Sequence, residues 1–263
     1  MKKMFFFTLL AITLSSCSSV LLTGRKQLLL VNDADLLAMS LQSYKQFIDS
    51  VPASKDKLNT ALVKKVGGKL SSAVENYLKT SGMEAEIANY AWEFNLVKDT
   101  SVNAFCMPGG KVAVFDGILP VTSNEAGLAV VIGHEIAHAV AKHSAERMSQ
   151  QMIAQYGAAI TDVLLADKPE MTRVGINTLY GLGAQYGVIL PYSRKQEYEA
   201  DRLGLIFLAM AGYDPTSAIG FWERMSANGK NAPMEFLSTH PSDANRIAKM
   251  KESLPEAMTY LKK

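Results

Sequence analysis

Residues 134 to 138 read His-Glu-Ile-Ala-His, a spacing that can carry out metal chemistry. Side chains four residues apart on a helix project from nearly the same face, so His134 and His138 can aim two imidazole nitrogens at one zinc ion. Glu135 lies about 100° round the helix, where it can hold a metal-bound water and act as a general base. The string predicts metal-assisted hydrolysis of an amide, with two buried core histidines as the alternative.

The sequence around this string favours one long helix, which the motif requires. Thr122 and Glu125 stand in capping-box register before a helical run that extends to about Gln150 and lacks Pro. Apolar residues surround both histidines, so the imidazoles are expected to be buried.

A catalytic zinc ion needs three protein ligands and an open position, so a third ligand must come from elsewhere. The chain has four histidines in all. The metzincin arrangement is excluded, because Ser144 stands where its third His belongs. His143 misses that register by one residue, which predicts a solvated or helix-packing role.

A second helix supplies carboxylates. Ser193 and Gln196 form a capping box, and the helix is expected to end before Gly212. Glu197 and Asp201 are four residues apart and therefore adjacent, which is unfavourable unless a cation lies beside them. We predict Glu197 as the third zinc ligand and Asp201 as the acceptor that fixes the tautomer of a ligand His. A surface helix with paired acids is the alternative.

Taken together, these stretches resemble the zinc metallopeptidase family of the CaaX prenyl proteases and HtpX, in its soluble, periplasmic lipoprotein branch. The resemblance implies a gluzincin endopeptidase with one Zn²⁺ per chain. It also implies an α+β fold, a mainly helical zincin-type metallopeptidase domain with a small antiparallel sheet beside the zinc helix. The matching segments span roughly residues 90 to 250 and are Asn103-Ala104-Phe105, Pro108-Gly109-Gly110, His134 to His138, Glu197 to Asp201, and Thr239-His240-Pro241 followed by Arg246.

The resemblance assigns roles to two residues outside the zinc helices. His240 would donate to the oxyanion of the tetrahedral intermediate. A mobile His240 could instead occupy the open zinc position as an inhibitory fourth ligand, and an ordinary surface-loop His is the third alternative. Arg246 resembles the active-site arginine of the family, with a surface salt bridge as its alternative.

Residues 90–97 and 112–115 carry strand-forming side chains, and Pro108-Gly109-Gly110 is predicted to form the turn before the last strand. The edge of this sheet could accept an extended peptide by strand addition. The resemblance places Asn103, Ala104 and Phe105 on that substrate-binding edge, and a covered edge strand is the alternative.

The N-terminus indicates where the chemistry happens. Lys2 and Lys3 precede a short apolar run, and Leu14-Ser15-Ser16-Cys17 is typical of a bacterial lipobox. We expect a signal peptide over residues 1–16, lipidation of Cys17, a tether over 17–30 and a single metallopeptidase domain over 31–263. Ser18, rather than Asp, follows this Cys, which in enteric-type bacteria implies that the lipoprotein is sorted to the outer membrane. The protein would then face the periplasm. A simple secretory signal with an incidental Cys is the alternative.

Composition narrows the remaining classes of protein. The net charge of +2 gives no indication of nucleic-acid binding, and Cys106 is interpreted as a small hydrophobe in a strand. Residues 33–79 predict two helices separated near Pro52. The Gly-rich stretch 150–191 suits closely packed helices near the cleft, a segment that gates it, or a surface for lipid or an apolar partner.

Two function classes follow from these observations. The first is a zinc endopeptidase of the cell envelope that cleaves unfolded or misassembled proteins. The second is a holdase or assembly factor for outer-membrane proteins, with the outer-membrane assembly machinery as a partner and little proteolysis. Glu135 favours the first class, because a structural zinc site has no need of a base beside an open position.

Overall fold

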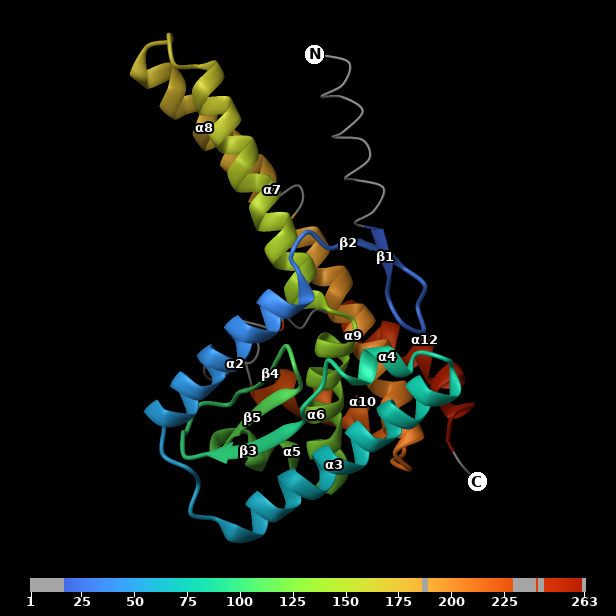
Figure 1. Ribbon diagram of the computed structural model, residues 1–263. Helices are drawn as coiled ribbons and strands as arrows, with labels where there is room; N and C mark the ends of the chain where they lie inside the picture. Colours follow the sequence, from blue (N-terminus) through green and yellow to red (C-terminus); the bar gives the residue numbers. More distant parts are fainter. Residues whose placement is uncertain (1–16, 186–188, 229–239, 241–243, 262–263) are drawn as a thin grey trace. The chain divides into compact units, whose positions relative to one another are not determined.

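The computed structural model describes residues 17–185, 189–228, 240 and 244–261 (Figure 1). The chain forms two compact units. Unit 1 contains Met1–Asp33 and Lys142–Gln196, and unit 2 contains Ala34–Ala141 and Glu197–Lys263. The predicted signal peptide, residues 1–16, lies outside the described residues, as do Thr239 and Pro241.

The sheet of unit 2 has three strands, β3 (Glu93–Val97), β4 (Ala104–Met107) and β5 (Lys111–Phe115), in the order β3-β5-β4. β4 and β5 are antiparallel and joined by the predicted turn, where Gly109 and Gly110 have φ values of 90° and 78°. β3 joins the far side of β5 and runs parallel to it. The α+β class is confirmed, but the sheet is mixed rather than antiparallel because β3 does not pair with its sequence neighbour.

Helices make up most of unit 2. The helix α9 (Leu190–Met210) begins in unit 1 and continues into unit 2. The others are α2 (Asp33–Ser50), α3 (Lys57–Thr80), α4 (Glu84–Ile87), α5 (Leu119–Thr122), α6 (Glu125–Val140), α10 (Ser217–Asn228) and α12 (Ala244–Met258), with the 3-10 helix η1 (Asp116–Ile118). The predicted pair of helices on either side of Pro52 is confirmed by α2 and α3.

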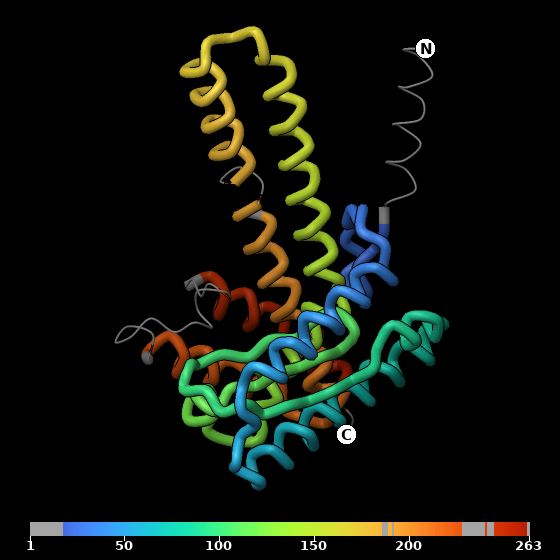
Figure 2. Tube along the Cα trace, turned by 60° about the vertical axis from the view of Figure 1, so that its left-hand side comes forward, coloured from blue at the N-terminus to red at the C-terminus, as the bar shows by residue number. Residues whose placement is uncertain are grey.

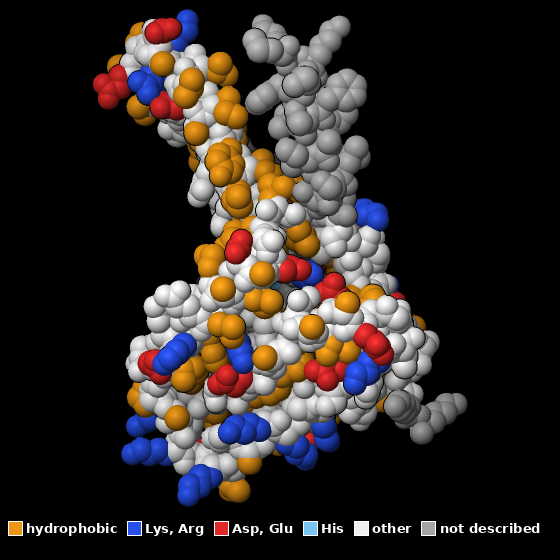
Figure 3. All heavy atoms as spheres, in the orientation of Figure 1, with side chains coloured by type: hydrophobic (Ala, Val, Ile, Leu, Met, Phe, Trp, Pro, Cys, Tyr) orange, Lys and Arg blue, Asp and Glu red, His pale blue; other side chains and the backbone are white. Residues whose placement is uncertain are grey.

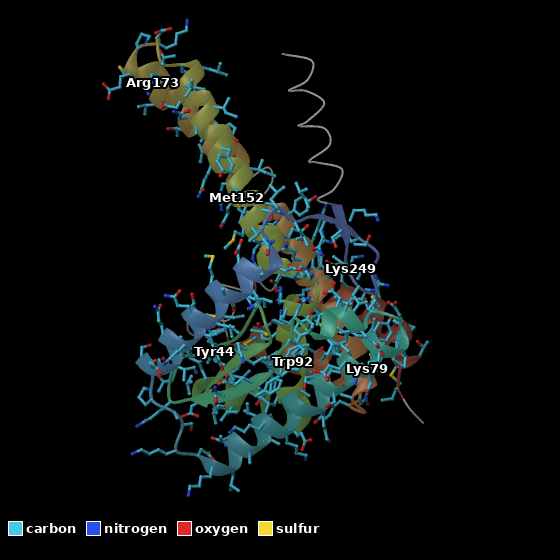
Figure 4. The ribbon with its side chains drawn as sticks, viewed as in Figure 1. Tyr44, Lys79, Trp92, Met152, Arg173 and Lys249 are labelled. Carbon is cyan, nitrogen blue, oxygen red and sulfur yellow. The ribbon has the colours of Figure 1, made fainter. Side chains whose placement is uncertain are left out.

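Helices cover both faces of this sheet. On one face lies Tyr44 of α2, which is labelled in Figure 4. It packs against Val97 and Phe115, and its hydroxyl donates to the backbone oxygen of Val112 at 2.9 Å. On the other face, α3 approaches so closely that a Cβ on Gly67 would overlap the ring of Phe94. The central strand β5 is therefore buried on both sides.

Two helix boundaries differ from the prediction. The N-cap of α6 is Asn124, whose side chain accepts from the Gly127 N–H at 2.9 Å, so Thr122 does not cap it. The helix also ends at Val140, well before Gln150, because Lys142 adopts a left-handed conformation with φ 54°. Lysine seldom adopts this conformation, so the sequence gives no sign of the break.

The helix α9 begins earlier and ends where predicted. Its first residue is Leu190, so Ser193 and Gln196 lie inside the helix and do not form a capping box. Its C-terminal end is closed by Gly212, at φ 82°, and by a hydrogen bond from the Tyr213 N–H to the Leu208 oxygen at 2.9 Å.

Unit 1 combines a short β-hairpin with a helical hairpin. β1 (Cys17–Ser19) pairs antiparallel with β2 (Lys26–Leu28), and α7 (His143–Leu164) lies beside α8 (Glu170–Ala184) (Figure 2). Residues 17–30 were predicted to be a tether, yet Arg25 forms a bidentate ion pair with buried Glu146 at 2.7 and 2.8 Å. Charged and backbone groups, together with the buried side chain of Val20, hold this segment.

The helical hairpin is built from the Gly-rich stretch. The two helices pack against each other, but none of the α8 side chains is buried. The expected close packing is therefore limited to the contact between α7 and α8. Within the described part of the chain, none of the helices combines the length and apolar character needed to cross a bilayer.

Candidate metal centre

A glycine of α9 allows the helices of the centre to approach each other. A Cβ on Gly204 of α9 would lie 3.3 Å from the His134 backbone nitrogen and 3.5 Å from the Gly133 carbonyl carbon of α6. Because Gly204 has no side chain, α6 and α9 lie close enough for residues from both helices to share one ion.

Four buried side chains converge at this contact: His134, His138, Glu197 and His240. Each offers one ligand atom, and these atoms all lie within 4.8 Å of one another. The His134 Nε2 atom lies 3.1 Å from His138 Nε2 and 3.2 Å from His240 Nδ1. Glu197 Oε2 lies 3.3 Å from His134 Nε2 and 3.0 Å from His240 Nδ1, and Glu197 Oε1 lies 3.3 Å from His138 Nε2.

These distances fit a tetrahedral metal site. Ligand atoms bound to zinc at about 2.0–2.2 Å lie about 3.3–3.5 Å from one another, close to the separations in the cluster. Three imidazole nitrogens and one carboxylate are also a donor set that zinc prefers. A cation between these four side chains would neutralise the Glu197 carboxylate. It would also accept the lone pairs of the imidazole nitrogens and the carboxylate oxygen, which otherwise face each other in a buried space.

Asp201 and Arg246 lie against the cluster, and Arg246 Nη2 is 3.2 Å from both His134 Nε2 and Glu197 Oε2. Asp201 Oδ1 lies 3.1 Å from His134 Nδ1, which leaves His134 Nε2 to face the other ligands. Arg246 binds Asp201 in a bidentate ion pair, with distances of 2.6 and 2.8 Å, and its Nη1 donates to the backbone oxygen of His240 at 3.1 Å. Arg246 thus links the carboxylate that orients one histidine to the backbone of another.

The electrostatics favour charged carboxylates. Burial alone would raise the pKa of Glu197, but the His138 charge and hydrogen bonds from the cluster histidines hold that pKa well below its usual value. Burial likewise opposes ionisation of Asp201, and the nearby Arg246 guanidinium lowers its pKa. Both groups are therefore ionised at neutral pH, as a ligand and a ligand-orienting acid must be.

Glu135 lies beside the cluster with one oxygen unused. Its Oε2 accepts from the Cys106 backbone N–H at 3.2 Å. Its Oε1 is buried without a hydrogen bond in the described structure, and His240 Nε2 lies 3.4 Å away. A carboxylate oxygen in this position can accept a proton from a water or a substrate that enters the site.

The strand β4 runs along the side of the site that contains Glu135. The Phe115 N–H donates to the Asn103 oxygen, so in this antiparallel register the N–H groups of Ala104 and Cys106 point away from β5. The side-chain oxygen of Asn103 accepts from the Ala104 N–H at 2.9 Å. The outer N–H groups of this edge are thus already bonded, one of them to Glu135.

The structure separates the alternatives for several predicted residues. His240 and Arg246 are buried, which excludes the surface-loop and surface-ion-pair interpretations. His143 is fully buried, so its solvated alternative is excluded as well. The Phe105 side chain does not face the cluster but packs on Phe47 of α2, with ring centroids 4.9 Å apart. The contact that β4 makes with Glu135 therefore comes from its backbone, through the Cys106 N–H.

Two features of the site could not be found from the sequence. The Trp222 ring stacks on the Arg246 guanidinium at 3.6 Å and lies edge-on to His134. The Cys106 N–H holds Glu135, while burial and the Glu135 charge raise the pKa of the Cys106 thiol well above its usual value. No spacing rule links Trp222 to Arg246, and backbone donors leave no trace in residue types.

Comparisons with known proteins agree with this centre. The model of peptidase family M48 matches residues 65–254, and that of the prokaryotic membrane lipoprotein lipid attachment site matches residues 1–18. The mitochondrial metalloendopeptidase OMA1 of Schizosaccharomyces pombe is 40% identical over 190 residues, covering 72% of this chain and 53% of that protein.

Two further relatives extend the similarity. The mitochondrial metalloendopeptidase OMA1 of Homo sapiens is 30% identical over 97% of this chain and 48% of its own. The beta-barrel assembly-enhancing protease of Escherichia coli is 30% identical over 78% of this chain and 40% of its own. The chain spans about half the length of the curated relatives it matches.

Proposed function

Because the chain belongs to peptidase family M48, as its motifs predicted, we propose that it is a zinc-dependent endopeptidase. The observation that carries this proposal is the buried cluster of four ligand atoms with the unused Oε1 of Glu135 beside it. A purely structural site would not need a free carboxylate oxygen next to its ligands. The names of the relatives, metalloendopeptidase and protease, support the same activity.

Each residue of the cluster has a role in this proposal. His134, His138 and Glu197 hold one zinc ion, and Asp201 fixes the His134 tautomer. The ion, when bound, supplies Lewis-acid polarisation of the scissile carbonyl. Glu135 takes the proton of the attacking water and later delivers it to the leaving amine. Arg246 keeps Asp201 ionised and in place.

His240 has two candidate roles that the geometry ranks. Its Nδ1 lies with the ligand atoms, 3.0 Å from Glu197 and 3.2 Å from His134, which supports the role of an inhibitory fourth ligand. Donation to the oxyanion requires His240 to leave this position. If it is an inhibitory ligand, His240→Ala should cleave faster than wild type. If it is the oxyanion donor, the same variant should be about 100-fold slower or worse.

The relatives and the N-terminus support a proposal for the substrates and the location of the protein. We propose that the protein is anchored through acylated Cys17 to the outer membrane, faces the periplasm and cleaves unfolded or misassembled envelope proteins. The beta-barrel assembly-enhancing protease among its relatives supports this substrate class and a partnership with the outer-membrane assembly machinery. An extended substrate would add to the edge formed by Asn103, Ala104 and Phe105, beside Glu135, and would have to displace the Asn103 side chain from the Ala104 N–H.

Glu135→Gln tests the peptidase proposal with little change in shape. We expect cleavage of an unfolded outer-membrane β-barrel protein to fall about 10²- to 10⁴-fold, while zinc content measured by atomic absorption stays the same. Glu84→Gln, which changes an exposed glutamate outside the cluster, is the matched control and should cleave normally. Equal cleavage by Glu135→Gln and wild type would overturn the proposal. Suppression of substrate aggregation by both proteins would then indicate the holdase.

A further inference from the structure

The α7–α8 hairpin has an unusual surface along its shafts, by which we mean the parts of α7 and α8 within residues 148–161 and 174–184. The sequence contains no charged residue from 148 to 161 or from 174 to 193. Large apolar side chains are nevertheless exposed along both helices. Three more lie at the turn between the two stretches, where Val163, Leu164 and Met171 are 75%, 77% and 90% accessible. The rest of the exposed set comprises Ile153, Tyr156, Ile160, Val174, Ile176, Leu179 and Leu182.

The charges of the hairpin gather at its two ends. Figure 3 shows hydrophobic side chains along α7 and α8 and charged ones around the turn between them. Arg173, labelled in Figure 4 near that turn, pairs with Asp162 at 2.7 Å. A helix that faces water usually carries charged residues along its exposed face, and an extended exposed apolar surface marks an interaction site.

The same unit carries the lipid attachment site. The match to this site covers residues 1–18, and Cys17 is the first residue of β1. The segment that follows is fixed to the base of α7 by the Arg25–Glu146 ion pair and by the Leu30 N–H, which donates to Ser149 Oγ at 2.9 Å. Acylation of Cys17 would therefore hold the hairpin close to the bilayer that contains the acyl chains.

We propose that the α7–α8 hairpin is a membrane-contact element whose exposed apolar side chains enter the interface of the bilayer that anchors Cys17. An amphipathic segment on a lipid surface gains affinity from buried apolar area, and a tether raises its effective concentration there. In this proposal the hairpin lies in the interface of the bilayer and does not cross it.

The absence of charge on the shafts makes the proposal specific. A basic surface would bind anionic lipids and release them at high salt. This hairpin has no cations along its shafts, so its binding should depend on apolar contact and change little with ionic strength. The inference rests on the proposed lipid anchor but not on peptide-bond cleavage, so Glu135→Gln should bind vesicles as wild type does.

Vesicle flotation tests the hairpin apart from the acyl chains. The mature chain carrying Cys17→Ser, which cannot be acylated, should float with vesicles of phosphatidylethanolamine and phosphatidylglycerol in both low and high salt. Val163→Gln/Leu164→Gln/Met171→Gln should lower the bound fraction about tenfold or more, since each exposed side chain contributes apolar area. The control Met39→Gln/Leu41→Gln/Leu58→Gln changes exposed apolar residues of unit 2 and should bind normally.

A depth measurement gives an independent readout. Tryptophan fluorescence of Leu164→Trp should shift to shorter wavelength and be quenched by brominated lipids, whereas Leu58→Trp should not respond. The natural Trp92 and Trp222 contribute background fluorescence, which is measured with the wild-type protein and subtracted. Quenching at both positions, or at neither, would overturn the assignment of the hairpin.

Other results would assign this surface to a different partner. Failure of the Cys17→Ser protein to float, or equal flotation of the hairpin variant, would overturn the proposal, as would binding that disappears in high salt. A dimer that the hairpin substitutions dissociate would show that a second copy covers the surface. Slower cleavage of an unfolded protein by the hairpin variant without vesicles would show a substrate-binding surface instead.

Discussion

The metal centre of unit 2 and the α7–α8 hairpin of unit 1 reverse the usual distribution of side chains in opposite ways. The centre buries charge: Glu135, Glu197, Asp201 and Arg246 are each at most 6% exposed. The hairpin exposes large apolar residues on shafts that lack charge. A buried charge must find partners inside the protein, whereas an exposed apolar side chain finds its partner outside.

Substitutions should therefore have different effects in the two regions. In the centre, the charges are mutually dependent, because removal of one takes an opposite charge away from buried partners: Arg246, for example, pairs with both Asp201 and Glu197. On the hairpin, the side chains contact little of the described chain, so their replacement should leave folding intact and affect only binding. Four predictions can break or sharpen this contrast.

The largest effect should come from Glu197→Ala. The loss of this ligand removes the negative charge that balances the cation. We therefore expect zinc affinity to fall by more than the roughly 10- to 100-fold that follows loss of a ligand-orienting partner, and cleavage to become undetectable. Glu84→Ala, which changes an exposed glutamate of α4, is the control. Retention of one zinc per chain by Glu197→Ala would remove this residue from the ligand set.

The second prediction compares two bidentate ion pairs of similar geometry. Asp201 and Arg246 are buried, whereas Glu256 and Arg202 are paired at 2.7 Å with 38% and 36% of their side chains exposed. Asp201→Asn should lower the free energy of unfolding by about 3–5 kcal/mol, because Arg246 keeps its charge in a buried position. Glu256→Gln should cost less than about 1 kcal/mol. Equal losses in urea denaturation would contradict the contrast.

The third prediction concerns pH. Burial lowers the pKa of His134, but its hydrogen bonds to Asp201 and Glu197 outweigh burial and raise that pKa to about 9. In the metal-free protein, protonated His134 therefore contributes stability that is fully present below about pH 6.5 and is lost as the pH rises through about 9. Zinc must displace this proton, so zinc affinity should rise with pH up to about 9.

Two measurements check this dependence. Urea denaturation of the metal-free protein should show the loss between pH 6.5 and 9, and calorimetry in buffers of different ionisation enthalpy should show proton release when zinc binds. A metal-free stability that is flat across this range would mean that His134 is already neutral.

The smallest effect should come from the hairpin. In water without lipid, Val163→Gln/Leu164→Gln/Met171→Gln should change the free energy of unfolding by no more than about 0.5 kcal/mol, as is usual for exposed positions. Val66→Gln, at a fully buried position of α3, is the contrasting variant and should be strongly destabilising. A loss above about 1 kcal/mol in the hairpin variant would show that the protein itself covers this surface.

The sequence predicted the parts of the molecule that depend on local periodicity. His134 and His138, and likewise Glu197 and Asp201, are four residues apart on helices, so each pair was expected to share a face. The family and the α+β class, which the motifs implied, are confirmed. The two helices around Pro52 also follow from residues close in sequence.

Features that depend on distant residues could not be predicted. The strand β5 lies between β4 and β3 in the sheet and runs parallel to β3, so this pairing joins residues that are not neighbours in the sequence. The stacking of Trp222 on Arg246 likewise joins α10 to α12. The break after α6 depends on Lys142 in a left-handed conformation that carries no sequence signal. The packing of residues 17–30 depends on Glu146, a residue far along the chain.

The hydrogen bond between Gln196 and Glu146, 2.7 Å long, bears on how this architecture can vary. It joins the two ends of the segment Lys142–Gln196, which is inserted between the helix carrying His134 and the residue Glu197. With these ends tied together, the entropic cost of closing the segment grows only slowly with its length. The inserted hairpin can therefore be shortened, lengthened or exchanged for another while the ligand residues keep their places, which makes it a natural site for grafting new targeting elements.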